Sequence, residues 1–271
     1  MLRIPALSVC LLLIFSDADA QAQGLLWSLP EDGTLIRIEG QYRQTVFRPT
    51  SDQGNLELEW LRRMTISSVG REDADYRGTV QPCRWIEIKL QTGGPSQDGI
   101  DRGLVGERIY KVLVPESAIR GSISDDDGLP VSYIPMVKGY RSTSTDQPAQ
   151  PIRSRMLQIY PVISLIRHYN TMEQSDIEQT VQVGQADVVA KELTGVLVQE
   201  SRTRRIRHET RLMRSDQVPF GLAEWEVKVA EERKADVEKR EQFQQVSEVT
   251  VTMKVQKIET GAQSELSIDQ N

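Results

Sequence analysis

Hydrophobic and polar residues alternate along most of the chain, which is typical of strands that bury one face. In residues 34–47, Ile36, Ile38, Tyr42 and Val46 fall on one face. Residues 56–66 place apolar side chains at every second position, and only Arg62 interrupts that face. Residues 51–55, with the sequence SDQGN, supply turn residues between the two runs. We therefore predict an antiparallel hairpin here.

The same alternation predicts further strands along the chain. Residues 83–90 and 107–115 form the next pair, joined by a long exposed loop at 91–103. Pro115 ends the second strand of this pair, since it has no N–H group for a ladder. Four more strands are predicted at residues 186–200, 202–213, 222–229 and 247–258.

Two segments favour a helix. Residues 161–172 carry apolar side chains at helical spacing, and Pro161 suits the first turn of a helix. Residues 230–245 are charged, lack Gly and Pro and consist largely of good helix formers. We interpret them as a solvated helix, with long twisted hairpin arms as the alternative.

These patterns predict a mainly β fold class: a large antiparallel curved sheet or half-barrel with one or two helices, or alternatively two packed sheets. Residues 23–260 are expected to form a single β-rich domain, with two halves split near 142–151 as the alternative, because that stretch is rich in turn residues. Residues 261–271 are predicted to be a disordered tail.

Residues 1–22 have the features of a secretory signal peptide: Arg3, a short apolar run and small residues before the cleavage point. The apolar run is shorter than the roughly 20 residues that a membrane-spanning helix needs. We expect an exported protein, periplasmic or extracellular, with no transmembrane segment after signal cleavage.

The charge balance bears on the partners. The chain has 33 Lys and Arg against 39 Asp and Glu, a net charge of −6, which disfavours a nucleic-acid partner. The sequence carries no phosphate-binding loop, dinucleotide fingerprint or metal-ligand spacing, so we predict no cofactor and no metal site. No catalytic residue is singled out.

Cys10 would leave with the signal peptide, so Cys83 would have no partner within the chain. A buried packing role is the preferred interpretation, because free cysteine is among the most buried residue types. An interchain disulfide and a reactive thiol are the alternatives.

Three other polar features have simple interpretations. His208 falls on a strand face with apolar neighbours, and His168 flanks the predicted helix. Neither stands at metal-ligand spacing from a cysteine, an aspartate or another histidine. The acidic stretch 125–128 lacks both end ligands of a calcium loop and is interpreted as a turn.

Residues 202–214 carry six arginines and form the most distinctive feature of the sequence. On a strand, Arg205, Arg207 and Arg211 project to one side, which gives a candidate anion-binding face. The alternative is pairing with glutamates of neighbouring strands, and the candidates are Glu192, Glu224 and Glu226.

The stretches CRWIEIKL (83–90), ERIYKVLVP (107–115) and VPFGLAEWEVKV (218–229) carry an outline resemblance. The chain resembles uncharacterised exported bacterial β-rich proteins and, more distantly, the half-barrels of periplasmic lipoprotein carriers. Those carriers open with an amphipathic helix, whereas this chain is expected to begin with a strand close to Trp27. The resemblance implies a curved sheet and assigns no functional residue.

Three functional hypotheses follow. The preferred one is an exported, non-enzymatic binding or envelope-associated protein whose curved sheet holds an apolar ligand or docks a partner, with Trp60 and Trp225 as residues to test. Its partner would be a lipid, another envelope component or a protein. The alternatives are an anion-binding surface on the arginine-rich strand and a carboxylate-dependent hydrolase.

Overall fold

The structure is a computed structural model of the chain. It describes residues 24–97, 99–103, 106–119, 121, 134–144, 147–154, 157 and 171–268. The candidate signal peptide 1–22, the acidic stretch 125–128 and His168 lie outside the described residues.

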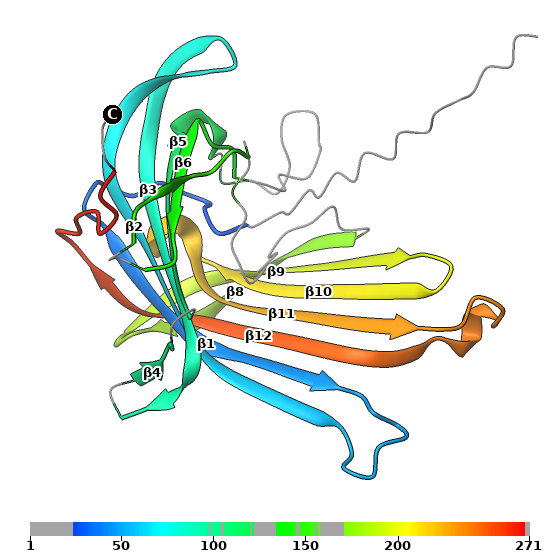
Figure 1. Cartoon of the computed structure of the whole chain (residues 1–271). Coiled ribbons are helices and arrows are strands. Elements are labelled where there is room, and N and C mark those ends of the chain that lie inside the picture. Colours follow the sequence, from blue (N-terminus) through cyan, green and yellow to red (C-terminus); the bar gives the residue numbers. More distant parts are fainter. Residues whose placement is uncertain are drawn as a thin grey trace, which may run out of the picture.

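The chain forms one 12-stranded sheet in which every paired neighbour is antiparallel (Figure 1). The first seven strands are β1 (Leu35–Val46), β2 (Leu56–Tyr76), β3 (Thr79–Ser96), β4 (Gly99–Asp101), β5 (Glu107–Pro115), β6 (Lys138–Ser142) and β7 (Gln150–Pro151). The others are β8 (Thr171–Val183), β9 (Ala186–Glu200), β10 (Arg204–Arg214), β11 (Leu222–Arg233) and β12 (Gln244–Glu259). Three short 3₁₀ turns complete the described elements, at Glu116–Ala118, Pro219–Gly221 and Arg240–Gln242.

The strand order is β7-β6-β5-β3-β2-β1-β12-β11-β10-β9-β8, with β4 paired to the end of β3. Because β1 pairs with β12, strands from both sides of the turn-rich stretch 142–151 belong to one sheet. The prediction of a large antiparallel curved sheet is therefore confirmed, and the sheet is continuous rather than two packed layers. The predicted hairpin around residues 51–55 is confirmed by the pairing of β1 with β2.

The sheet bends strongly, so that β2, β3 and β5 stand at a steep angle to β9–β12 (Figure 1). Gly40 of β1 lies against the backbone of β12. A Cβ atom at this position would overlap the carbonyl group of Thr252, so only glycine allows the two strands to approach this closely.

The hydrophobic core covers one face of the sheet, here called the inner face. Alternate residues of the central strands supply it, which is the packing that the period-two pattern predicts. Examples are Ile38, Met64, Ile88, Val112, Leu212 and Met253. Leu25, Leu26 and Trp27 precede β1 and pack into the same core. The backbone N–H of Trp27 donates to the Phe220 carbonyl at 2.9 Å.

Of the two predicted helices, one lies mostly outside the described residues and the other is not found. Residues 161–170 lie outside the described residues, but Thr171 and Met172, the predicted end of that helix, belong to β8. The preferred helix at 230–245 is wrong: β11 continues to Arg233 and β12 begins at Gln244. The hairpin-arm alternative holds at the two ends of this segment, where cross-strand pairing continues to Arg233 and Gln244, while residues 234–243 form the loop between the strands.

The two segments predicted to be irregular both contact the sheet. The loop expected at 91–103 is mostly strand, because β3 continues to Ser96 and β4 pairs back onto it. Part of the expected tail contacts the sheet: the buried carboxylate of Glu87 accepts hydrogen bonds from the Ser264 hydroxyl at 2.7 Å and from the N–H groups of Glu265 and Leu266 at 2.9 and 3.2 Å. The Leu266 side chain is buried.

Within the described residues, no helix has the length and apolar character needed to cross a membrane.

Candidate functional site

Arg205, Arg207 and Arg211 of β10 lie on the face opposite the core, as predicted, and each has a carboxylate partner. Arg205 pairs with Glu232 of β11, and Arg207 Nε lies 2.6 Å from Glu209 Oε1. Arg211 contacts two further glutamates at 2.5 and 3.6 Å, and these are Glu192 and Glu224. Two of the three predicted pairing partners are therefore found.

A shallow depression around Arg205 and Arg207 shows how the charges balance. Its lining contains four cations, Arg205, Arg207, Lys228 and Arg240, and four anions, Glu200, Glu209, Glu232 and Glu248. Arg205 also lies over the Phe243 ring, 4.8 Å from its centroid. Ion pairing occupies this face, and an anion-binding role for it stays a prediction.

Cys83 is a fully buried free thiol on the outer face of β3. It packs with Ala74 and Leu113, and its Sγ donates to the Gln81 carbonyl at 3.4 Å. Burial raises the pKa of the Cys83 thiol, and the carboxylates of Asp73 and Glu72 act in the same direction. This environment is that of a packing cysteine, the preferred interpretation of the sequence.

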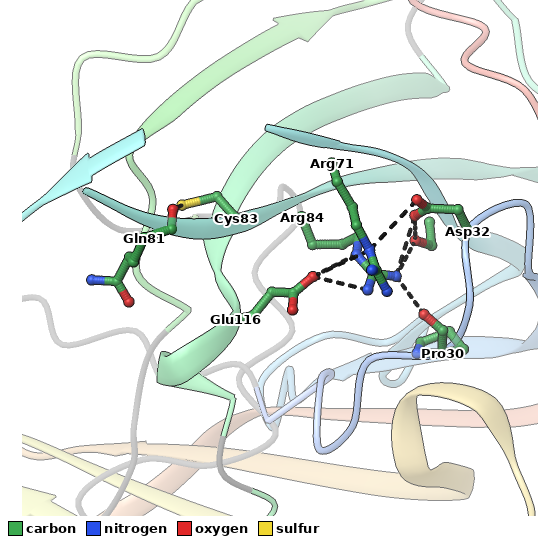
Figure 2. Close-up of polar contacts among 8 residues, drawn as sticks. Pro30, Asp32, Arg71, Gln81, Cys83, Arg84 and Glu116 are labelled. Atoms are coloured by element: carbon green, nitrogen blue, oxygen red, sulfur yellow. Dashed lines mark hydrogen bonds and ion pairs between the residues drawn. The ribbon is translucent and has the colours of Figure 1, made fainter. Parts of the chain in front are cut away.

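Arg84, the next residue, points to the opposite side of β3 into a polar cluster (Figure 2). Its guanidinium group lies 2.9 Å from Glu116 and 3.2 Å from Asp32, and it donates to the Pro30 carbonyl and the Ser68 hydroxyl. This buried arginine fastens the segment before β1 to β3 and to the turn after β5. The cluster is structural in character, since its donors and acceptors satisfy one another.

The last candidates from the sequence are the histidines and a possible metal site. His208 is buried on the inner face of β10, as its strand position predicts. Among the side chains that the structure describes, no group of three His, Cys, Asp or Glu residues could hold a metal ion.

A pocket of about 570 Å³ opens on the inner face at the ends of β1, β2 and β3. Tyr42 and Trp60, a directly opposed cross-strand pair, form its aromatic wall with ring centroids 5.2 Å apart. Both rings are half-buried, whereas Trp225, the other tryptophan that the sequence suggests testing, is buried in the core. Leu90 and Thr92 of β3 also line this pocket.

Backbone forms much of the opposite wall, where four glycines line the pocket: Gly93, Gly94, Gly103 and Gly106. A Cβ atom at Gly93 would overlap the Asp101 carbonyl, and one at Gly106 would overlap the carbonyls of Arg102 and Thr92. The return of β4 onto β3 therefore requires glycine at position 93, and the segment after β4 requires glycine at position 106. Arg102, in that segment, also lines the pocket.

Arg62 lies in this pocket on the inner face of β2 and is only 1% exposed. Its guanidinium group lies 5.1 Å from the centroid of the Tyr42 ring. Burial lowers the pKa of Arg62 to about 10, which the nearby Tyr42 partly counters, so the side chain is still a cation at neutral pH. Its Nε and Nη1 atoms are buried and find no hydrogen-bond partner in the described part of the chain.

Carboxylates on the strands around the pocket have other partners. Glu107, at the start of β5, pairs with Arg102 and accepts a hydrogen bond from Gln91 at 2.9 Å. Asp101 accepts a hydrogen bond from the Gly103 N–H at 3.1 Å, and Glu39 pairs with Arg63 on the other face of the sheet at 2.6 Å. The pocket therefore combines aromatic surface with a buried arginine that makes no ion pair within the described residues.

Sequence reasoning did not assign this pocket, although one signal for it is present in the sequence. Arg62 is the single charged residue on the apolar face of residues 56–66. A charge on the core-facing side of a strand is expensive unless it is paired or used, so this interruption is the observation that points to a site.

No family model matches the chain, and the search of curated proteins finds no similar protein.

Proposed function

We propose that the protein is a non-enzymatic binding protein that holds the apolar part of a ligand in the pocket on the inner face of its curved sheet. The observation that carries the proposal is the half-buried aromatic pair Tyr42 and Trp60 at the edge of the core, beside a pocket of about 570 Å³. Pockets for small ligands have volumes of about 300–1,000 Å³ and are lined mainly by apolar and aromatic groups.

The chemistry of the lining supports binding rather than turnover. The cations of the pocket are arginines, which hold their protons at neutral pH and therefore orient anions rather than transfer protons. The carboxylate of Asp101 serves the Gly103 N–H in the turn after β4. Aromatic rings and arginines together favour a ligand that is retained without being altered.

The proposal agrees with the expectation of an exported protein whose partner is a lipid or another envelope component. The outline resemblance to periplasmic lipoprotein carriers points the same way. Both stay predictions, as do the two alternatives of an anion-binding surface on β10 and a carboxylate-dependent hydrolase.

The test is titration of the purified protein with Nile red, a neutral apolar dye that fluoresces when it leaves water. We expect saturable binding that weakens at least about fivefold in a Trp60→Ala variant, because an aromatic contact of about 1 kcal/mol is lost. Val80, which is 70% exposed on β3 and remote from the pocket lining, gives the control variant Val80→Ser. Absence of saturable binding, or equal binding by all three proteins, would overturn the proposal.

A further inference from the structure

We propose that the ligand of this pocket is an anionic amphiphile, and that Arg62 and Thr92 together bind its carboxylate or phosphate group. The inference rests on the proposed function and adds the chemical class of the ligand. The apolar body of the ligand would lie against Tyr42 and Trp60, and its charged end would lie at Arg62.

Buried polar atoms without a hydrogen-bond partner are concentrated at Arg62 and Thr92. In the described part of the chain, five buried side-chain nitrogen or oxygen atoms have no hydrogen-bond partner. Three of them belong to one cross-strand pair, since Arg62 of β2 lies directly opposite Thr92 of β3 and contributes Nε and Nη1, while Thr92 contributes Oγ1. Buried polar groups in folded proteins are nearly always satisfied, so this concentration indicates a missing partner.

Arg84 is about as deeply buried as Arg62, but its polar atoms have partners. Arg84 is 2% exposed and has two carboxylate partners, Glu116 and Asp32, together with the Pro30 carbonyl and the Ser68 hydroxyl. The fold thus satisfies one buried arginine fully and leaves the other without an acceptor among the described residues. A buried cation without a counterion costs several kcal/mol, and an anionic ligand would remove that cost.

The polar groups of the pocket indicate the charge and the chemical form of the ligand. The guanidinium group and the Thr92 hydroxyl are donors, so they fit a carboxylate or a phosphate. The lining of the pocket contains three arginines, Arg62, Arg102 and Arg108, and one carboxylate, Asp101, so positive groups outnumber negative ones. Because the aromatic pair lies beside Arg62, the anion would be attached to an apolar or aromatic body.

The test is competition against bound Nile red with three probes that share one alkyl chain: decanoate, decyl phosphate and decanol. For the wild-type protein we expect both anions to compete at concentrations at least about tenfold lower than decanol, because hydrogen bonds to a charged group are the strong ones. The ratio between decanoate and decyl phosphate distinguishes a carboxylate ligand from a phosphate ligand.

Two variants isolate the role of Arg62. Arg62→Met should reduce the preference for the anions to less than about threefold while leaving decanol competition unchanged. It should also melt at the same temperature as the wild type or higher, because replacing a buried charge by an apolar side chain is neutral or stabilising. The matched control is Arg63→Met, since Arg63 is the next residue but pairs with Glu39 on the other face.

Each contrary result has a defined meaning. Equal competition by decanol and the anions, with Nile red binding intact, would overturn the anion inference and leave the proposed function standing. A lower melting temperature for Arg62→Met would make Arg62 a structural residue and would also overturn it. Competition by inorganic phosphate or acetate as strong as that of the amphiphiles would show a small-anion site instead. Failure of Nile red and every probe to bind would remove the proposed function itself.

Discussion

The carboxylate of Glu87 in β3 accepts a hydrogen bond from the backbone N–H of Leu266, which lies 179 residues later in the chain. The same carboxylate holds Ser264 and Glu265, so it fastens the end of the chain to the outer face of the sheet. Replacing Glu87 with alanine should cost about 2–3 kcal/mol, because two backbone N–H groups lose their acceptor and Leu266 loses its buried position. Urea unfolding measures the loss.

Limited proteolysis gives a second readout for Glu87→Ala, since a released tail should be cleaved sooner than the sheet. The control is Glu173→Ala, because Glu173 is an exposed residue of β8. Tail cleavage at the wild-type rate would show that Glu87 does not hold the tail.

Arg84→Met should destabilise the protein by about 2–3 kcal/mol, because the change removes the hydrogen bonds that join the Pro30 carbonyl, Ser68 and Glu116. Arg71→Met is the control in the same cluster (Figure 2): its side chain is 61% exposed and its ion pairs measure 3.5 and 3.7 Å. Its loss should stay below about 1 kcal/mol. Thermal unfolding of both variants tests the contrast, and equal losses would contradict it.

Cys83 should be inert in the folded protein. Because the pKa of the buried thiol is raised, the thiol stays protonated at neutral pH and its sulfur is inaccessible. We expect negligible labelling by a thiol reagent in native buffer and full labelling in urea. Rapid native labelling, or a disulfide-linked dimer under non-reducing conditions, would restore one of the alternative roles.

Glu107 should contribute to the acid sensitivity of the fold. Burial alone would raise the pKa of Glu107, but the hydrogen bond from Gln91 and the charges of Lys89 and Arg102 lower it overall. A carboxyl group whose pKa is lower in the folded state stabilises the protein above its unfolded pKa of about 4.3, and this stabilisation is lost as the pH falls through the folded value.

The wild type should therefore lose more stability than Glu107→Gln between about pH 5 and pH 3. Urea unfolding at several pH values measures the difference. Parallel profiles for the two proteins would show that the Glu107 contacts do not contribute to folding.

Much of the sheet can be predicted from the sequence, because strands that bury one face must alternate. The predicted strand 186–200 coincides with β9, and Pro115 ends β5 as expected. By contrast, β8 was missed because it is the last strand of the sheet and most of its described side chains are exposed, so little alternation is required of it.

Other features depend on contacts that local sequence does not encode. Residues 230–245 consist largely of good helix formers, yet residues 230–233 and 244–245 extend β11 and β12 through cross-strand pairing, and a loop joins them. The pairing of Glu87 with the tail joins distant positions. The inner pocket depends on the strand register that places Arg62 opposite Thr92, and the sequence shows only the isolated charge.

The pairing of β1 with β12 also determines the order in which the molecule can be assembled. Leu35 pairs with Glu259, so β1 can complete its pairing only when β12, the last of the described strands, is present. Until then, the edge of β1 has no partner on that side, and such edges are prone to intermolecular association. Contacts between residues so distant in sequence are characteristic of slowly folding proteins. We therefore expect the unfolded chain to need protection from association until β12 is available to pair with β1.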